Sequence, residues 1–238
     1  MFMNKLRNIF GQRVGQMVVM CIAAVAMTMS TTRSEAQSAE AEMEASAERA
    51  RKVLSEMSSK VKSAQTVSVG FTATLENKRT GEKTENKGTL AMKGEKYVLD
   101  VNDMVTYHNG KEVAVWQKRH NEVDISDPDP EEEGDLSPKK IFSAYNEGYR
   151  LRMLGDVKVG TSVCCEVDLY PTDKTSIVRI RLTIDKSTKQ LKRFWQQNKS
   201  GETLTVTIDR YETNKAMVDD MFTFDASKHP DIEVVDLR

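Results

Sequence analysis

The chain has 238 residues, 39% of them hydrophobic, and a formal net charge of −1 from 35 basic and 36 acidic side chains. This balance gives no global attraction to nucleic acid or to an anionic membrane, so we expect no nucleic-acid partner. The length is sufficient for one sizeable domain with a hydrophobic core of its own.

The first 36 residues have the pattern of an export signal. The leader carries three basic residues, Lys5, Arg7 and Arg13. An apolar run over residues 17–29 follows, shorter than the roughly 20 residues of a membrane span. Ser34 and Ala36 then place small residues at the positions that signal peptidase prefers before a cleavage site between Ala36 and Gln37. We therefore predict a cleaved signal peptide over residues 1–36, a mature domain over residues 37–238, and localisation in the periplasm. Retention as a membrane anchor, or lipidation at Cys21, are the less favoured alternatives.

The mature chain keeps two adjacent cysteines, Cys164 and Cys165, in a strand-like run. Neighbouring residues of a strand point to opposite faces, so a disulfide between them would be strained. We expect one buried thiol and one outward thiol, and a fold that depends on packing alone.

One helix is predicted near the start of the mature chain, over Ala39 to Ser63. Its apolar residues recur at the spacing of a single helix face, namely Ala50, Val53, Leu54, Met57 and Val61. Glu48 with Lys52, and Glu56 with Lys60, have the spacing of favourable ion pairs.

From residue 66 onwards, apolar and polar residues alternate with a period of two, which predicts strands. The strands expected are Val67–Leu75, Gly88–Met92, Tyr97–Val101, Val105–His108, Val113–Gln117, a short one around Val123 and Ile125, Tyr149–Leu154, Val163–Tyr170, Ile177–Ile184, Leu191–Gln197 and Leu204–Tyr211. Ten or eleven short strands joined by tight turns, such as the Asn109-Gly110 hairpin signal, indicate a mainly β protein with one curved antiparallel sheet, either a barrel or a half-barrel.

An acidic, proline-containing insert separates the two groups of strands, from Asp127 to Asp135. Ser137-Pro138 then begins a predicted short helix. Its apolar face consists of Ile141, Phe142 and Tyr145. A short helix inserted within a sheet protein has to cover something, so we interpret these three residues as a lid, or as a plug at a barrel end.

Candidate catalytic residues are few. His108, His120 and His229 are scattered without metal-ligand spacing, and we expect them on the surface or in turns. The acidic insert lacks the spaced ligands of a calcium loop. Trp116 and Trp195 are interpreted as sheet packing. We therefore predict no enzyme activity, no metal and no cofactor.

Five motifs occur in order along the mature chain. They are Val69-Gly70-Phe71-Thr72, Lys87-Gly88-Thr89-Leu90-Ala91-Met92-Lys93, Tyr107-His108-Asn109-Gly110-Lys111-Glu112-Val113, Asp168-Leu169-Tyr170-Pro171, and Asp220-Met221-Phe222-Thr223-Phe224 followed by Ile232-Glu233-Val234 and Asp236. Together with the order of signal, helix, strands, short helix and strands, they resemble LolA, the periplasmic lipoprotein carrier family. One departure concerns the arginine that holds the lid in the best-studied members, because Gly94 occupies that place here.

The resemblance implies a half-open barrel, capped by helices, around an apolar concavity for acyl chains. The apolar strand residues expected to line this cavity are Val69, Phe71, Leu90, Met92, Leu99, Val115, Ile180, Leu182, Leu204 and Val206. The period of two does not say which sheet face is concave.

The function expected from the resemblance is that of a monomeric chaperone. It would receive acylated lipoproteins from an inner-membrane exporter and deliver them to an outer-membrane acceptor. A periplasmic sensor of lipids or lipoproteins with the same fold is the leading alternative, followed by storage of a hydrophobic ligand, with an enzyme last.

Overall fold

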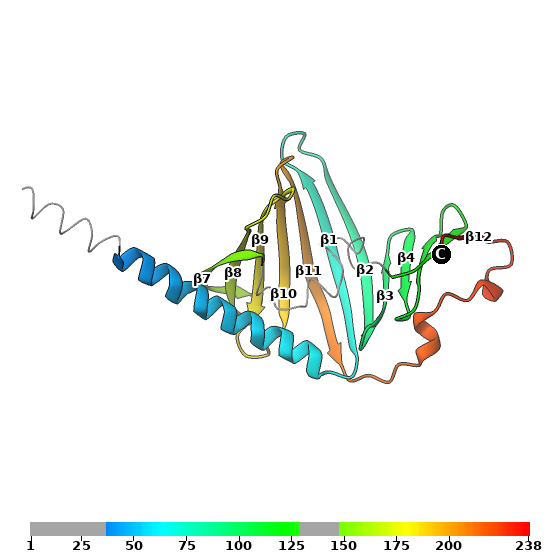
Figure 1. Ribbon diagram of the computed structural model, residues 1–238, viewed down its shortest axis with the longest axis horizontal. Helices are drawn as coiled ribbons and strands as arrows, with labels where there is room; N and C mark the ends of the chain where they lie inside the picture. The colour runs from blue at the N-terminus through cyan, green and yellow to red at the C-terminus, as the bar shows by residue number, and fades with distance from the viewer. Residues whose placement is uncertain (1–36, 129–147) are drawn as a thin grey trace, which may run out of the picture. The chain divides into compact units, whose positions relative to one another are not determined.

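A computed structural model describes residues 37–128 and 148–238. Residues 37–63 are helical, and most of the remaining described residues form strands (Figure 1). The chain divides into two compact units, residues 1–46 and residues 47–238. The described part of the first unit, residues 37–46, is helical. The predicted signal peptide, and the predicted lid residues Ile141, Phe142 and Tyr145, lie outside the described residues.

In the described residues of the second unit, twelve strands are formed. The first six are β1 (Val67–Asn77), β2 (Lys83–Lys93), β3 (Lys96–Val101), β4 (Met104–His108), β5 (Val113–Gln117) and β6 (Glu122–Ser126). The other six are β7 (Tyr149–Val159), β8 (Ser162–Pro171), β9 (Ile177–Asp185), β10 (Leu191–Asn198), β11 (Glu202–Thr213) and β12 (Glu233–Asp236). Two short 3-10 helices, η1 (Asp219–Phe222) and η2 (Ala226–Lys228), precede β12.

All twelve strands form a single open sheet in the order β12-β6-β5-β4-β3-β2-β1-β11-β10-β9-β8-β7. Figure 1 shows the succession from β7 through β11 and β1 to β4 side by side. The predicted fold class, a mainly β protein with one open, half-barrel-like sheet and a capping helix, is confirmed. One strand was not predicted: β12 adds to β6, and this pair is parallel whereas the other pairs are antiparallel.

The helix packs through its residues 47–63 on one face of the sheet, which we call the helix face. Its residues Ala50, Leu54 and Met57 are buried, and Val53 and Val61 are partly buried, so the predicted apolar stripe is confirmed. The stripe meets a cluster from the sheet: Val67, Val69, Leu90, Tyr97, Leu151, Cys165, Val167, Leu169, Ile177, Ile180, Leu182, Ile184, Leu191 and Phe194. Burial of side chains such as Leu54 and Met57 contributes about 1.5–3 kcal/mol each.

Glu56 does not follow the predicted pairing with Lys60: its carboxylate lies 2.8 Å from Nζ of Lys189, in the β9–β10 turn.

A second, smaller core lies on the opposite face of the sheet, over β4 to β6. Phe222 is fully buried there, and the C-terminal segment, residues 217–238, supplies further rings. The Trp116 ring lies 5.9 Å from the Phe224 ring and 4.3 Å from the His229 ring, measured between centroids. Tyr107 also contacts Phe224 edge-on. These contacts show that the C-terminal segment covers this end of the sheet. In Figure 1 its orange and red ribbon runs from the end of β11 past β3 and β4 to β12.

Two predictions about polar residues were wrong. His108 is not on the surface: it is 7% exposed and stacks on Tyr97 at 5.0 Å, because the β3–β4 register places these rings side by side. Cys164 and Cys165 are both buried and both free. Cys165 faces the helix-covered core, whereas Cys164 faces the other way. Asp185 lies opposite Cys164 in register. The charges of Asp185, Lys192 and Arg193 all act on the Cys164 thiol, so these longer side chains lie near it. They bury the thiol that was expected to face water.

Candidate functional site: the apolar helix face

Strand register places all ten predicted cavity residues on the helix face. Residues directly opposite in a sheet share a face, and alternate residues of one strand do so too. The linking pairs are Val69 with Leu90, Leu90 with Leu99, Leu99 with Thr106, Thr106 with Val115, Phe71 with Ile208, Val67 with Met92, Phe194 with Val206 and Leu182, and Gln196 with Leu204 and Ile180. The sequence pattern therefore selected a set that lies together in space. Binding of acyl chains by this set stays a prediction.

Burial divides these ten residues into two groups. Val69, Leu90, Ile180 and Leu182 are buried in the main core. The other six, Phe71, Met92, Leu99, Val115, Leu204 and Val206, are only partly buried. Leu75, at the far end of β1 on the same face, is 49% exposed. The helix face thus continues beyond the helix as an apolar surface that is partly open to solvent.

A glycine on β2 sets the position of one of these rings. Gly88 lies opposite Phe71 in register, and a side chain at Gly88 would collide with the Phe71 ring and approach the carbonyl oxygen of Asp100 to 2.9 Å. The missing side chain leaves room for the Phe71 ring next to Gly88. Two other residues of this β2 motif, Leu90 and Lys93, point to opposite faces of the sheet. Leu90 is buried in the core, and Lys93 contacts the C-terminal segment.

A pocket of about 490 Å³ opens beside the helix, between its first turns in the second unit and strands β7 to β9. Its apolar lining consists of Val53, Met153, Leu154, Cys165 and Ile184. None of these was among the predicted cavity residues. Alternation along β7 and β8 could have suggested Met153 and Cys165, but the pocket itself depends on where the helix lies on the sheet.

Charged side chains surround this pocket, four basic and two acidic: Arg49, Lys52, Lys186, Lys189, Asp156 and Asp185. Lys186 pairs with Asp156 at 2.6 Å. Hydrogen bonds hold the pKa of Asp185 well below its usual range. They come first from the Ser162 hydroxyl, then from the backbone N–H of Thr188 and from the hydroxyl and the backbone N–H of Ser187. Burial raises the pKa of the Cys165 thiol, so it stays protonated and apolar in the lining. An apolar floor with a mainly cationic rim is suited to an amphiphilic molecule.

A buried polar side chain lies among the apolar residues of the helix face. Gln196 is 7% exposed and lies between Ile180 and Leu204 in register. Its Nε2 donates to Oδ1 of Asn198 at 3.0 Å, while its Oε1 has no partner among the described residues. A buried oxygen of this kind can accept a hydrogen bond from a bound molecule.

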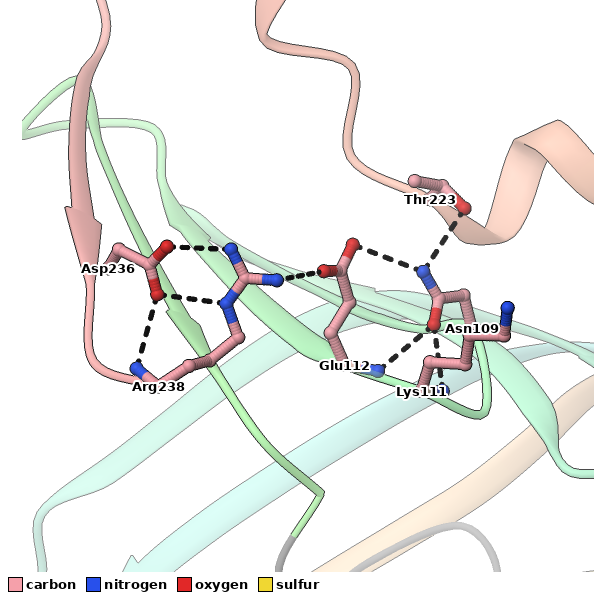
Figure 2. A network of polar contacts seen from close by, with 6 residues as sticks. All are labelled: Asn109, Lys111, Glu112, Thr223, Asp236 and Arg238. Atoms are coloured by element: carbon pink, nitrogen blue, oxygen red, sulfur yellow. Dashed lines mark hydrogen bonds and ion pairs between the residues drawn. The ribbon is translucent and has the colours of Figure 1, made fainter.

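The β4–β5 hairpin is joined to the C-terminal segment by a chain of polar contacts (Figure 2). The residues involved are Asn109, Lys111, Glu112, Thr223, Asp236 and Arg238. Arg238 donates to Asp236 at 2.6 Å and to Glu112 at 2.9 Å, and Asn109 links Glu112 to Thr223. The hydrogen bonds from Arg238 lower the pKa of Asp236 to about 2. Two of the sequence motifs, the hairpin and the closing segment, therefore meet in space.

A second contact holds the same segment at the β2–β3 hairpin. Lys93 and Lys96 both donate to Asp219, at 2.7 and 2.8 Å, and lower its pKa to about 2. Gly94, between them, has φ +59° and no atom within 4 Å of the position of a Cβ. The lysines on each side of Gly94 therefore tie this hairpin to the C-terminal segment, and Gly94 itself makes no such contact.

Two further observations concern chemistry and membranes. Within residues 37–128 and 148–238, no three His, Cys, Asp or Glu side chains are grouped so that they could hold a metal ion. In the same ranges, no helix is both long enough and apolar enough to cross a bilayer.

These features define a class of protein with a single open sheet, an apolar face partly covered by a helix, and a C-terminal segment fastened to the other face. The family model described as outer membrane lipoprotein carrier protein LolA matches residues 41–207. The chain belongs to this family. No curated protein matches the chain in sequence.

Several solved structures are similar to this chain at low sequence identity. An uncharacterized conserved protein from Thermus thermophilus is 13% identical with a TM-score of 0.52, and the match covers 79% of this chain and 99% of that protein. A putative outer membrane lipoprotein-sorting protein domain from Vibrio parahaemolyticus is 12% identical with a TM-score of 0.44, covering 74% and 97%. Lipoprotein LppX from Mycobacterium tuberculosis is 13% identical with a TM-score of 0.43, covering 71% and 98%.

Proposed function

We propose that this protein is a periplasmic carrier, which binds the acyl chains of lipoproteins on its helix face and moves them from an inner-membrane exporter to an outer-membrane acceptor. Membership of the lipoprotein carrier family supports this proposal. The observation that carries it is the partly open apolar surface made by Phe71, Leu99 and Val115 beyond the helix.

The physical requirement for such a carrier is a place where acyl chains leave water. Each methylene that is buried contributes about 0.8 kcal/mol, so an acylated protein needs an apolar surface during transit between membranes. The helix face offers that surface on several adjacent strands, and a rigid sheet presents it without reorganisation. The flexible side chain of Met92 can adapt to acyl chains of different shape, as a carrier of several cargoes requires.

The proposed function needs no bond to be broken, no metal and no cofactor. Export by the signal peptide over residues 1–36 would place the protein between the two membranes. Energy for loading would come from the exporter, and release would follow from a higher affinity of the acceptor for the cargo. The protein would act as a monomer, with one helix face for one cargo.

The proposal is tested with a charge on the apolar face. Leu99→Glu places a carboxylate among apolar side chains, where its desolvation is unfavourable. We expect loading of an acylated lipoprotein from inner-membrane vesicles to fall at least about tenfold, which corresponds to ~1.4 kcal/mol. Val218→Glu is the matched control, because Val218 is 71% exposed and lies outside the helix face.

Both variants are compared with the parent protein by thermal unfolding, and only folded material is assayed. Unchanged loading by folded Leu99→Glu protein would exclude the helix face as the cargo site. Transfer of a lipoprotein without acyl chains, at the same rate as the acylated form, would exclude acyl recognition altogether.

A further inference from the structure

A second pocket, of about 210 Å³, lies on the face of the sheet opposite the helix. Its lining comes from β8, β9, β10 and β11, and consists of Glu166, Arg179, Arg181, Thr183, Arg193, Trp195 and Thr205. Trp195 lies opposite Arg181 and Thr205 in register, whereas its neighbour Phe194 faces the helix. The sequence analysis interpreted Trp195 as packing and did not select these arginines.

A buried carboxylate fixes two of the three arginines. Asp168 is 1% exposed, and its two oxygens accept from Nε and Nη2 of Arg181 at 2.6 and 2.9 Å. Nη1 of Arg179 donates to the same carboxylate at 3.2 Å, and the Tyr170 hydroxyl donates at 3.2 Å. Burial alone would raise the pKa of Asp168, but the hydrogen bond and charge of Arg181 outweigh it, so the pKa is lowered. Asp168 is therefore ionised and holds both guanidinium groups in place.

Arg179 also covers the tryptophan. Its guanidinium carbon lies 4.9 Å from the centre of the Trp195 ring, within the range of a cation–π contact. Trp195 and the two threonines, Thr183 and Thr205, are part of the pocket lining. The guanidinium groups of Arg179 and Arg181 supply hydrogen-bond donors to the same lining.

The third arginine has an uncompensated charge. Arg193 is exposed, and among the residues that the structure describes its side chain has no hydrogen bond or ion pair. Glu166 accepts from Thr183 at 3.2 Å and lies 3.6 Å from Arg181, so its charge is shared with that pair. Three arginines against the two carboxylates Glu166 and Asp168 leave the pocket with an excess of positive charge, carried by Arg193.

We propose that this pocket is a docking site for a protein partner, and that it receives an acidic side chain, Asp or Glu, from an exposed segment of that partner. The planar fork of a guanidinium matches a carboxylate with two parallel hydrogen bonds. A tryptophan and arginines next to each other are the residues most often found at the energetic centre of protein interfaces.

The local charges favour a protein carboxylate over a membrane surface. Binding to anionic lipids requires several basic residues without intervening acids, each adding about 1 kcal/mol. Here Glu166 lies within the pocket. Arg193 can neutralise a single carboxylate, whereas the many phosphate groups of a membrane surface would also be repelled by Glu166.

The position of the pocket leaves the helix face free. A partner bound at Arg193 touches the opposite face of the same strands, so it does not compete with a molecule on the helix face. The inference depends on the chemistry of the pocket and goes beyond the proposed carrier function, and either can fail without the other.

The test uses the mature protein, labelled with ¹⁵N, and two synthetic peptides that contain a run of glutamate or the matching run of glutamine. The indole N–H signals of Trp195 and Trp116 are followed by NMR, since Trp116 lies in the separate aromatic cluster with Phe224. We expect the glutamate peptide to shift the Trp195 signal and leave the Trp116 signal unchanged, with an affinity that weakens as salt is added. The glutamine peptide is expected to have no effect.

Variants then assign the binding to the pocket. Arg193→Gln is expected to weaken the glutamate peptide at least about fivefold, and Arg193→Lys to weaken it less, because a point charge remains. Arg119→Gln removes one exposed charge in the β5–β6 turn, where Arg119 pairs with Asp103, and is expected to bind like the parent. Equal weakening by Arg193→Gln and Arg119→Gln would overturn the proposal, because the effect would then be general electrostatics.

Two further results would also overturn it. Binding to vesicles of phosphatidylglycerol through Arg193, without binding of the glutamate peptide, would assign the pocket to lipid phosphates. Tighter peptide binding after replacement of the chain's own acidic residues between Asp127 and Asp135 would assign it to that run of this chain. Loading of acylated cargo is measured on Arg193→Gln in parallel, and it is expected to be unchanged.

Discussion

The two halves of the sheet are covered on opposite faces by opposite ends of the described chain. Strands β7 to β11 and β1 bury their helix face under residues such as Leu54 and Met57. Strands β4 to β6 bury the other face under the C-terminal segment, through Phe222 and Phe224. An open sheet needs at least one buried face along its whole length, and this chain meets that need from both ends.

What each half leaves uncovered is of a different chemical kind. On the helix face, Leu99 and Val115 remain as partly exposed apolar side chains. On the opposite face of β9 and β10, Arg193 and Trp195 surround a polar pocket. The same alternation that builds the strands thus separates an apolar surface, proposed for cargo, from a charged one, proposed for a partner. The lowered pKa values of Asp236 and Asp219 are a third difference, since both carboxylates fasten the C-terminal segment to the sheet.

The comparison is tested most strongly at the helix. Leu54 is fully buried against the main core, and Leu54→Ala is expected to lower the free energy of unfolding by about 2–5 kcal/mol, through lost burial and the cavity that remains. Because the helix and β7 to β11 share one core, the loss should appear in the global transition. Urea denaturation followed by circular dichroism measures it. Ala47→Gly, at the margin of the same stripe, is the milder control, with an expected loss of about 1 kcal/mol.

A smaller and more local effect is expected at the other end of the chain. Phe222→Ala removes the one fully buried ring of the C-terminal segment, but that segment can detach without exposing the main core. We expect a loss in the global free energy of unfolding below ~2 kcal/mol, the lower end of the range for the helix variant. Faster hydrogen exchange should be confined to residues 219–236 and their neighbours on β4 to β6. Equal acceleration in β8 to β10 would show that the two cores unfold as one unit.

The local pattern of the sequence predicted most of the fold. The stripe of Leu54 and Met57 was confirmed because helical periodicity is set within the helix, and β5 has the predicted bounds Val113–Gln117 because its alternation is unbroken. β12 was missed for the opposite reason. It has four residues, most of them exposed, and its partner β6 is more than a hundred residues away in the chain, so nothing local identifies it.

The candidate site was predictable in composition and not in shape. Alternation identified which residues share the helix face, but the pocket beside Val53 and Met153 depends on the angle at which the helix crosses the sheet. The arginine pocket was missed because Arg179 and Arg181 alternate with apolar residues, as any solvated strand face does, and Arg193 lies on a different strand. Only the structure shows that buried Asp168 fixes two of them.

The mildest test separates the two halves by pH. The pKa of Asp236 is lowered to about 2 from 3.8 by hydrogen bonds from Arg238, and that of Asp219 to about 2 by Lys93 and Lys96. A lowered pKa in the folded state gives stability that is fully present above the unfolded value and is lost as the pH falls towards the folded value.

Between about pH 4 and pH 2 we therefore expect the C-terminal segment to loosen, with residues 219–236 losing protection before β8 to β10. Hydrogen exchange at stepped pH, corrected for the intrinsic exchange rate, measures this order. In Arg238→Ala, the contribution of Asp236 to the pH dependence should shrink to what the backbone N–H of residue 238 still supplies, while that of Asp219 persists. Simultaneous loss of protection in both halves of the sheet would show that these two carboxylates do not act locally.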